Sequence, residues 1–156
     1  MDGSIMTPEQ IIGRDGVLLI EKTADKHALL ATLAHRLAER AGCDEPALLA
    51  AVLKREALGS TGIGDGVAIP HARLANVKNP VGVLAILSRP VDFQAIDDKP
   101  VDVAVLLALP ETGAGAALEA LSCLSRRLRQ SGLRADLRRA VSSGAAYEIL
   151  CADRKP

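Results

Sequence analysis

The hydrophobic pattern of the first part of the chain predicts one strand followed by two amphipathic helices. Residues 17–20 are continuously apolar, which is typical of a short strand. Thr23 is the candidate N-cap of a helix through about residue 41, whose apolar stripe contains Leu29, Leu33 and Leu37. A second helix is predicted to open at residues 44–46 and to end before Gly59, with a stripe of Leu48, Leu49, Val52 and Leu53.

In the middle of the chain the helical pattern ends, and a glycine-rich segment is followed by strand-like apolar runs. Residues 59–66 read GSTGIGDG, and this density of glycine is expected to exclude any regular element. Three β-like runs follow at 67–69, 81–87 and 101–109. The last two are almost uninterrupted Val, Leu, Ile and Ala, which is typical of strands covered on both faces. Residues 97–100 are expected to form a turn between them.

The C-terminal part returns to helical spacing. One apolar stripe is predicted from Leu118, Leu121, Leu124 and Leu128, and a second from Leu133, Leu137 and Val141. Helices both before and after a buried sheet indicate an α/β fold, and we expect a mixed β-sheet flanked by helices.

Charge and composition narrow the class of partner. The chain balances 19 Lys and Arg against 19 Asp and Glu, which argues against nucleic acid as a partner. Phe93 and Tyr147 are its only aromatic residues, so platforms for stacking bases are missing. No apolar run approaches the roughly 20 residues of a membrane-spanning helix, and the N-terminus lacks the pattern of a secretory signal. We expect a cytoplasmic protein that does not insert into membranes.

Three cysteines and two of the three histidines are interpreted as background. Cys43, Cys123 and Cys151 are odd in number and lack C-x-x-C spacing, so reduced thiols are expected rather than disulfides or a zinc site. His27 and His35 lie among charged residues of the first predicted helix and are expected to face solvent. No metal site is predicted.

The C-terminal helices are locally basic. Only Glu119 and Asp136 offset a group of six arginines: Arg126, Arg127, Arg129, Arg134, Arg138 and Arg139. Two interpretations stay open, a solvated helix face or a docking patch for an acidic protein partner.

The candidate chemistry lies in residues 55–72, which read REALGSTGIGDGVAIPHA. The glycines allow backbone N–H groups to converge into a nest for an anion, although the lysine of a P-loop is missing. Pro70 stiffens the chain before His71, whose neutral imidazole has a lone pair at physiological pH. Arg55 falls on the helix stripe expected to face the core, where it either clamps phosphate oxygens or only meets the helix dipole. Together these features predict the handling of a phosphoryl group.

An active-site pattern of a known family is met here without a gap by Glu56, Ile63, Gly64, Val67, Ala68, Ile69, Pro70, His71 and Ala72. The chain resembles the enzyme IIA domain of the bacterial phosphoenolpyruvate-dependent phosphotransferase system, in its fructose/mannitol (type 2) class, and most of all the nitrogen-regulatory subgroup. The similarity continues through residues 91–102 and the arginine-rich tail. It places the domain at residues 13–152, between an N-terminal lead (1–12) and a C-terminal tail (153–156).

The resemblance implies a role for each residue of the motif. His71 would accept a phosphoryl group from a phosphohistidine on an HPr-like carrier, without a metal or an organic cofactor. Sugar-transporting members pass the group to a IIB domain, whereas in the nitrogen-regulatory branch it modulates partner proteins that include potassium-transport and sensor proteins. Both outcomes stay open. The implied phosphate-binding residues are Arg55, Ser60, Thr61, Gly62 and Gly64.

One position departs from the family pattern. Many members carry a second active-site histidine just before the first leucine of the later helix, where this chain has Ala117. Ala117 shares a helical face with Leu121, Leu124 and Leu128, so it is expected to point toward the pocket. Loss of one phosphate donor is expected to slow transfer by roughly 10²–10³-fold. The alternative is a binding regulator with little phosphotransfer.

Overall fold

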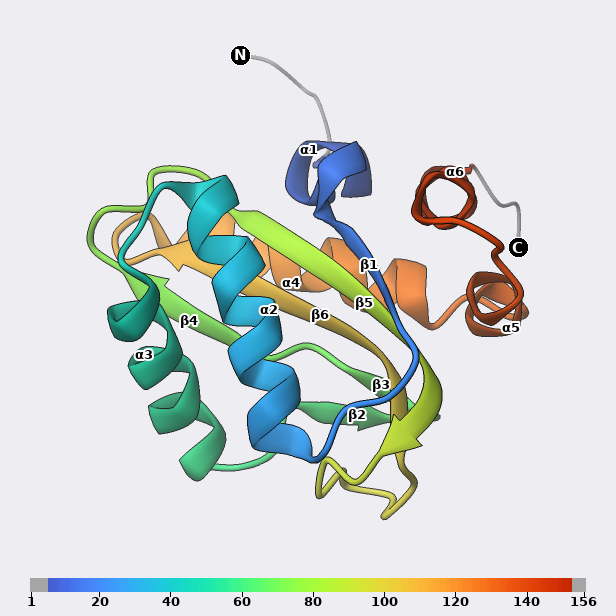
Figure 1. Ribbon diagram of the computed structural model, residues 1–156. Coiled ribbons are helices and arrows are strands. Elements are labelled where there is room, and N and C mark those ends of the chain that lie inside the picture. The colour runs from blue at the N-terminus through green and yellow to red at the C-terminus, as the bar shows by residue number, and fades with distance from the viewer. Residues whose placement is uncertain (1–5, 153–156) are drawn as a thin grey trace.

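The computed structural model describes residues 6–152, and their six strands form one mixed β-sheet (Figure 1). This confirms the fold class predicted from the sequence. The sheet runs in the order β1-β5-β6-β3-β2, with β4 also paired to β6. The strands are β1 (Val17–Ile20), β2 (Gly62–Gly64), β3 (Val67–Ala68), β4 (His71–Leu74), β5 (Val81–Val91) and β6 (Val101–Pro110).

Strand β6 is the centre of the sheet, and each of its residues is buried. It pairs antiparallel with β5 along one edge. Along the other edge it pairs in parallel with β3 and then with β4. Its residues alternate between two apolar clusters, with Ala104 and Leu106 in one and Val105 and Leu107 in the other. The expectation of a strand covered on both faces is therefore confirmed.

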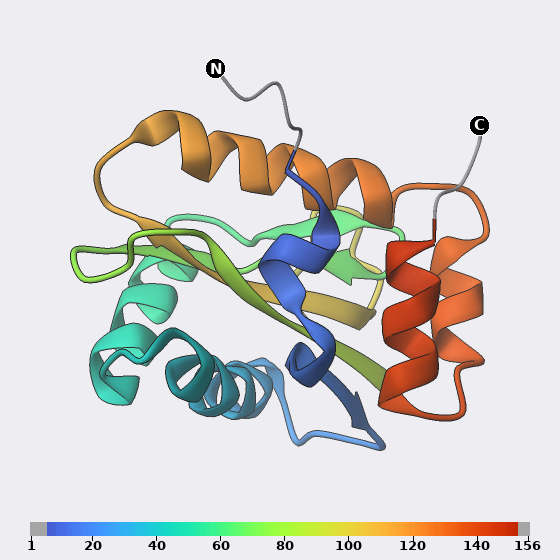
Figure 2. The same cartoon turned by 90° about the horizontal axis from the view of Figure 1, so that it is seen from above.

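Helices cover the two faces in unequal groups (Figures 1 and 2). On one face, α2 (Lys26–Ala41) and α3 (Glu45–Ala57) pack side by side. The opposite face is covered by α4 (Ala114–Leu128), and the apolar cluster on that side also takes in residues of α1 (Pro8–Ile12), α5 (Leu133–Arg138) and α6 (Ser143–Cys151). A short 3-10 helix, η1 (Arg14–Gly16), leads into β1. Helix α1 falls in the segment expected as a lead, and its Ile11 and Ile12 are buried.

The start of α2 and the glycine-rich segment differ from the expectation. Asp25, not Thr23, caps α2, because its carboxylate accepts a bond of 2.8 Å from the Ala28 amide. The glycine-rich segment contains strand β2, which pairs antiparallel with β3. Its Gly62 lies so close to Ala95 that a Cβ would stand 2.6 Å from the Ala95 Cβ. Glycine is required there by close approach rather than by a turn.

The apolar stripes of the C-terminal helices are also shifted. The buried face of α4 consists of Ala117, Ala120, Leu124 and Leu128, whereas Leu118 is 66% exposed. A step of one residue turns a helix by about 100°, so Leu118 cannot share the face that buries Ala117. Val141 follows the end of α5 and is 92% exposed.

Most of the basic residues near the C-terminus bind groups within the fold. The Asp102 carboxylate is fully buried and accepts bonds of 2.7 and 2.8 Å from the Arg134 guanidinium, with Arg138 at 3.1 Å. Arg127 donates to the carbonyls of Leu150 and Ala152 at 2.7 and 2.8 Å. Arg127, Arg134 and Arg138 thus bind groups of other elements, whereas Arg126, Arg129 and Arg139 are exposed. The exposed arginines agree with a solvated face, and the docking patch stays a prediction.

The side chains interpreted as background show ordinary environments. His27 and His35 are exposed, as predicted. Cys43, Cys123 and Cys151 are free thiols. Within residues 6–152 no group of His, Cys, Asp and Glu side chains is arranged to hold a metal ion. Across the same residues no helix combines the length and apolar character needed to span a membrane.

Replacing Arg134 by alanine is expected to lower the free energy of unfolding by about 3 kcal/mol, because the buried Asp102 would keep Arg138 as its only guanidinium. The matched control is Arg139→Ala, whose ion pair with Asp136 is exposed and should cost less than about 0.5 kcal/mol. Urea denaturation of both variants measures the difference. Equal, small losses would contradict an anchoring role for the Asp102 pair.

Candidate functional site

His71 stands where one edge of the sheet is interrupted and resumes. Strand β3 ends at Ala68, and Pro70 has no N–H to offer a neighbouring strand. The Pro70 carbonyl nevertheless accepts a bond of 3.0 Å from the Leu107 amide. Pairing with β6 then restarts at His71, opposite Leu107. His71 is therefore the first residue of β4, a strand that follows the predicted β-like run at 67–69 and that the sequence did not predict.

The environment of the His71 imidazole selects one neutral tautomer. Nδ1 lies 2.9 Å from the Ile69 carbonyl oxygen. A carbonyl oxygen can only accept, so Nδ1 carries the proton and Nε2 keeps the lone pair. Burial lowers the pKa of His71, and the charge of Arg55 acts in the same direction, while the bond to Ile69 and the charge of Glu56 oppose both. The neutral form with a free Nε2 is thus favoured at physiological pH.

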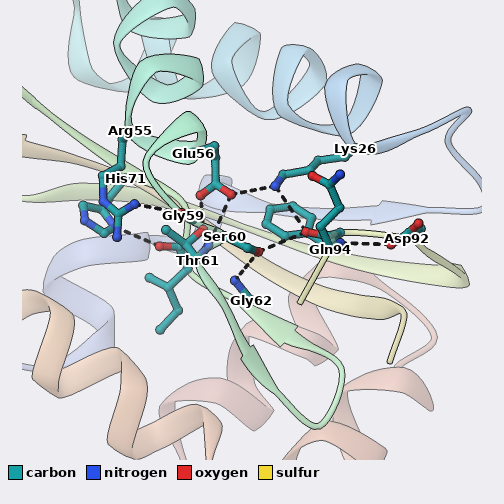
Figure 3. Close-up of polar contacts among 12 residues, drawn as sticks. Lys26, Arg55, Glu56, Gly59, Ser60, Thr61, Gly62, His71, Asp92 and Gln94 are labelled. Carbon is teal, nitrogen blue, oxygen red and sulfur yellow. Dashed lines mark hydrogen bonds and ion pairs between the residues drawn. The ribbon is translucent and has the colours of Figure 1, made fainter. Parts of the chain in front are cut away.

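Arg55 lies beside His71 in Figure 3 but does not face the core as the sequence predicted. Glu56, not Arg55, continues the buried stripe of α3 after Leu48 and Val52. The Arg55 guanidinium, in the last turn of the helix, donates a bond of 2.9 Å to the Gly59 carbonyl. The positive charge of Arg55 stabilises the C-terminal end of the helix dipole, and it also lies next to the imidazole.

Glu56 carries a network that the sequence interpretation did not identify (Figure 3). Its Oε1 lies 2.8 Å from Lys26 Nζ and 3.2 Å from the Thr61 amide nitrogen, and its Oε2 accepts the Thr61 hydroxyl. Lys26 also donates to the Phe93 carbonyl at 3.2 Å and stands 4.4 Å from the centre of the Phe93 ring. The sequence did contain a signal for this network, because Glu56 occupies a position on the apolar stripe of α3, about two turns after Leu48.

The loop before His71 uses several of its own polar groups. Besides the Thr61 amide, the Gly62 amide is occupied, since it donates to Ser60 Oγ at 3.0 Å. Ser60 in turn donates to the Phe93 carbonyl at 3.0 Å. Two amides of the expected anion nest therefore already donate hydrogen bonds to nearby side chains, Glu56 and Ser60.

The predicted site residues do not all lie in one place. Figure 3 brings together His71, Arg55, Ser60, Thr61 and Gly62. Gly64, with φ of 100°, instead lines a hollow of about 620 Å³ together with Arg129 and Arg134. Ala117 is fully buried in an apolar cluster that includes Ile69, and its direction toward the pocket stays a prediction.

Comparisons with known proteins agree with this geometry. A sequence model of the family described as phosphoenolpyruvate-dependent sugar phosphotransferase system, EIIA 2, matches residues 10–152. A nitrogen regulatory protein from Bradyrhizobium diazoefficiens is 39% identical over 141 residues, which cover 90% of this chain and 92% of that protein. The crystal structure of nitrogen regulatory protein IIA-Ntr from Neisseria meningitidis matches with a TM-score of 0.82 at 34% identity, covering 90% of this chain and 97% of that chain.

A more distant likeness concerns the fold alone. The mannitol IIA enzyme of Escherichia coli, solved as a complex with phosphorylated mannitol IIB, matches with a TM-score of 0.75 at 21% identity. The match covers 88% of this chain and 95% of that chain.

The two histidines His71 and His35 are expected to titrate on opposite sides of the ordinary value of about 6.5. Burial lowers the pKa of His71, whereas bonding to Glu45 and the nearby charge of Glu39 raise the pKa of His35. NMR titration of the imidazole resonances measures both midpoints, with His71→Ala and His35→Ala to assign them. A His71 midpoint above that of His35 would contradict the burial argument.

The same shifts give opposite pH dependences of stability. Because the pKa of His71 is lowered by folding, the unfolded chain binds its proton more readily. The contribution of His71 is complete above about pH 6.5 and is lost as the pH falls through the folded pKa. The contribution of His35 is complete below about pH 6.5 and is lost as the pH rises through its raised pKa.

Proposed function

Because the chain belongs to the EIIA 2 family of the phosphoenolpyruvate-dependent sugar phosphotransferase system, a family of phosphotransfer proteins, we propose that it is a regulatory phosphocarrier whose His71 Nε2 receives the phosphoryl group. The observation that carries this proposal is the bond between His71 Nδ1 and the Ile69 carbonyl. It leaves Nε2 as the nitrogen with a lone pair for attack on phosphorus. The donor is a phosphohistidine on an HPr-like carrier.

Transfer proceeds by in-line displacement. The Nε2 lone pair of His71 forms a bond to phosphorus, while the bond between phosphorus and the carrier nitrogen breaks and its electron pair returns to the carrier ring. The proton on His71 Nδ1 stays there throughout, donated to the Ile69 carbonyl oxygen. Such a reaction depends on positioning and on charge stabilisation, and a group that moves between two imidazoles needs no metal or organic cofactor.

Arg55 is proposed to stabilise the transferred group. Its guanidinium is beside His71 and exchanges the neutral Gly59 carbonyl for charged phosphate oxygens, which form stronger hydrogen bonds. The Ser60–Thr61–Gly62 segment contributes less than its glycines suggested, since two of its amides already have acceptors. We propose that this segment mainly shapes the site, since the Ser60 hydroxyl already donates to the Phe93 carbonyl and accepts the Gly62 amide.

The phosphoryl group is expected to be found on His71 alone. Incubation with labelled phosphoenolpyruvate, enzyme I and an HPr-like carrier should give an acid-labile label on the unmodified protein and none on His71→Ala. The matched control is His35→Ala, which removes an exposed imidazole and should label normally. A label that persists in His71→Ala would refute the assignment of the nucleophile.

Relatedness supports one of two destinations for the phosphoryl group. The 39% identity to a nitrogen regulatory protein favours control of partner proteins, such as potassium-transport or sensor proteins, over delivery of phosphate to a sugar-specific IIB domain. The sugar-specific alternative applies if the gene lies beside genes for IIB and IIC components. Genes for nitrogen regulation in that place would support the regulatory function.

The fully buried Ala117 favours a second candidate, a binding regulator in which phosphorylation acts as a switch and transfer onward is slow. An alanine supplies no donor to phosphate oxygens at the place where many relatives have an imidazole. For this candidate, His71→Asp, which adds a negative charge, should change the affinity for a potassium-transport or sensor partner by about tenfold or more. His71→Ala should bind like the unphosphorylated protein in the same calorimetric titration. Equal binding by both variants and by the phosphorylated protein would exclude a switch.

A further inference from the structure

A continuous series of hydrogen bonds joins the buried carboxylate of Glu56 to the imidazole of His71 (Figure 3). Glu56 accepts from both the amide and the hydroxyl of Thr61. The Thr61 carbonyl accepts from the Ile69 amide at 3.0 Å. The Ile69 carbonyl then accepts from His71 Nδ1 at 2.9 Å. Each bond fixes the residue that makes the next one.

We propose that Glu56 is a positioning residue that sets the tautomer and orientation of His71 through Thr61 and Ile69. This inference rests on the proposed function of His71, but it concerns a residue that does not meet the phosphoryl group. Both oxygens of Glu56 are bonded to Thr61, so the carboxylate holds this residue at two points. With Thr61 fixed, its carbonyl draws in the Ile69 amide and thereby aims the Ile69 carbonyl at Nδ1.

The burial of the network supports this role. Glu56 is 9% exposed and Thr61 is 6% exposed, so water cannot readily replace the bonds between them. If one of these buried hydrogen bonds is broken, its donor is left without an acceptor, and the loss of stability is larger than for the same bond at the surface. The loop therefore has one conformation that satisfies its polar groups, and in that conformation Nε2 carries the lone pair.

Lys26 compensates the charge of the buried Glu56 carboxylate, although it is not part of the series of hydrogen bonds that leads to His71. Its Nζ lies 2.8 Å from Glu56, and its side chain is 17% exposed. The ammonium compensates a charge that would otherwise be expensive to bury. It also donates to the Phe93 carbonyl, which accepts the Ser60 hydroxyl too, so Lys26 ties α2 to the same loop.

The series of hydrogen bonds depends on the acceptor atoms of Glu56 and not on its negative charge. Glu56→Gln and Glu56→Ala are therefore expected to affect His71 differently. In Glu56→Gln the amide oxygen still accepts from Lys26 and the Thr61 amide, while the NH₂ group donates to the Thr61 hydroxyl. In Glu56→Ala both acceptors are lost. A companion variant, Lys26→Met with Glu56→Ala, removes the ammonium that would be left without its partner.

Two measurements on the full chain test the proposal. Long-range proton–nitrogen NMR spectra show which nitrogen of His71 bears the proton, and single-turnover transfer from a phosphorylated HPr-like carrier gives the rate. For Glu56→Ala and for the companion variant we expect a mixture of tautomers and a fall in rate of about 10–100-fold. Glu56→Gln should keep the single Nδ1–H tautomer and most of the rate. The control Glu39→Ala removes an exposed carboxylate that pairs with His35 and should change neither reading.

The outcomes separate the two proposals. A single Nδ1–H tautomer in folded Glu56→Ala overturns the positioning role, and so does a Glu56→Gln variant as impaired as Glu56→Ala. If the unmodified protein accepts no phosphoryl group while the tautomers change as expected, the proposed function fails and the positioning role stands. Should Glu56→Ala not fold, Thr61→Val removes only the hydroxyl bond and should shift the tautomers in the same direction to a smaller extent. An unchanged tautomer in Thr61→Val would then overturn the proposal.

Discussion

The complete burial of β6 constrains the structure around it, because a strand without access to water must have its backbone groups paired along both edges. Strand β5 satisfies one edge. The other edge is shared between β3 and β4, with Pro70 between them. Proline cannot donate to a neighbouring strand, so the edge is interrupted there and resumes at His71. The interruption leaves the Ile69 carbonyl available for the imidazole, so the orientation of His71 is a consequence of how a buried strand is covered.

Two buried carboxylates hold the hairpin that precedes this histidine. At its beginning, Thr61 is bonded to Glu56, which pairs with Lys26 of α2. In its turn, the Gly66 carbonyl accepts from the Asp102 backbone amide, and the Asp102 side chain pairs with Arg134 of α5. Each charge is compensated by a cation from a distant element, as burial requires. Helices from both sides of the sheet therefore stabilise a short, glycine-rich hairpin that has little apolar surface of its own.

Electrostatics at the site favour a neutral His71 imidazole beside the Arg55 guanidinium. Burial and Arg55 lower the pKa of His71, so the imidazole stays neutral while the neighbouring guanidinium attracts phosphate oxygens. The buried Ala117 adds no hydrogen-bond donor from the α4 side. The proposed handling of the phosphoryl group therefore relies on the residues of α3 and of the 59–71 segment.

The sequence by itself predicted most of the main elements and singled out His71 as the candidate nucleophile. Continuous apolar runs identified β5 and β6, helical spacing identified α2, α3 and α4, and the proline before His71 singled out one of three histidines. Only the tertiary structure decided which polar groups meet. Asp102 and Arg134 are 32 residues apart, and Lys26 and Phe93 are 67 residues apart. It also showed that Glu56 rather than Arg55 is buried, and that the amides of Thr61 and Gly62 already have acceptors. Periodicity reports which face of an element is buried, whereas the partner of a buried charge depends on how separate elements pack together.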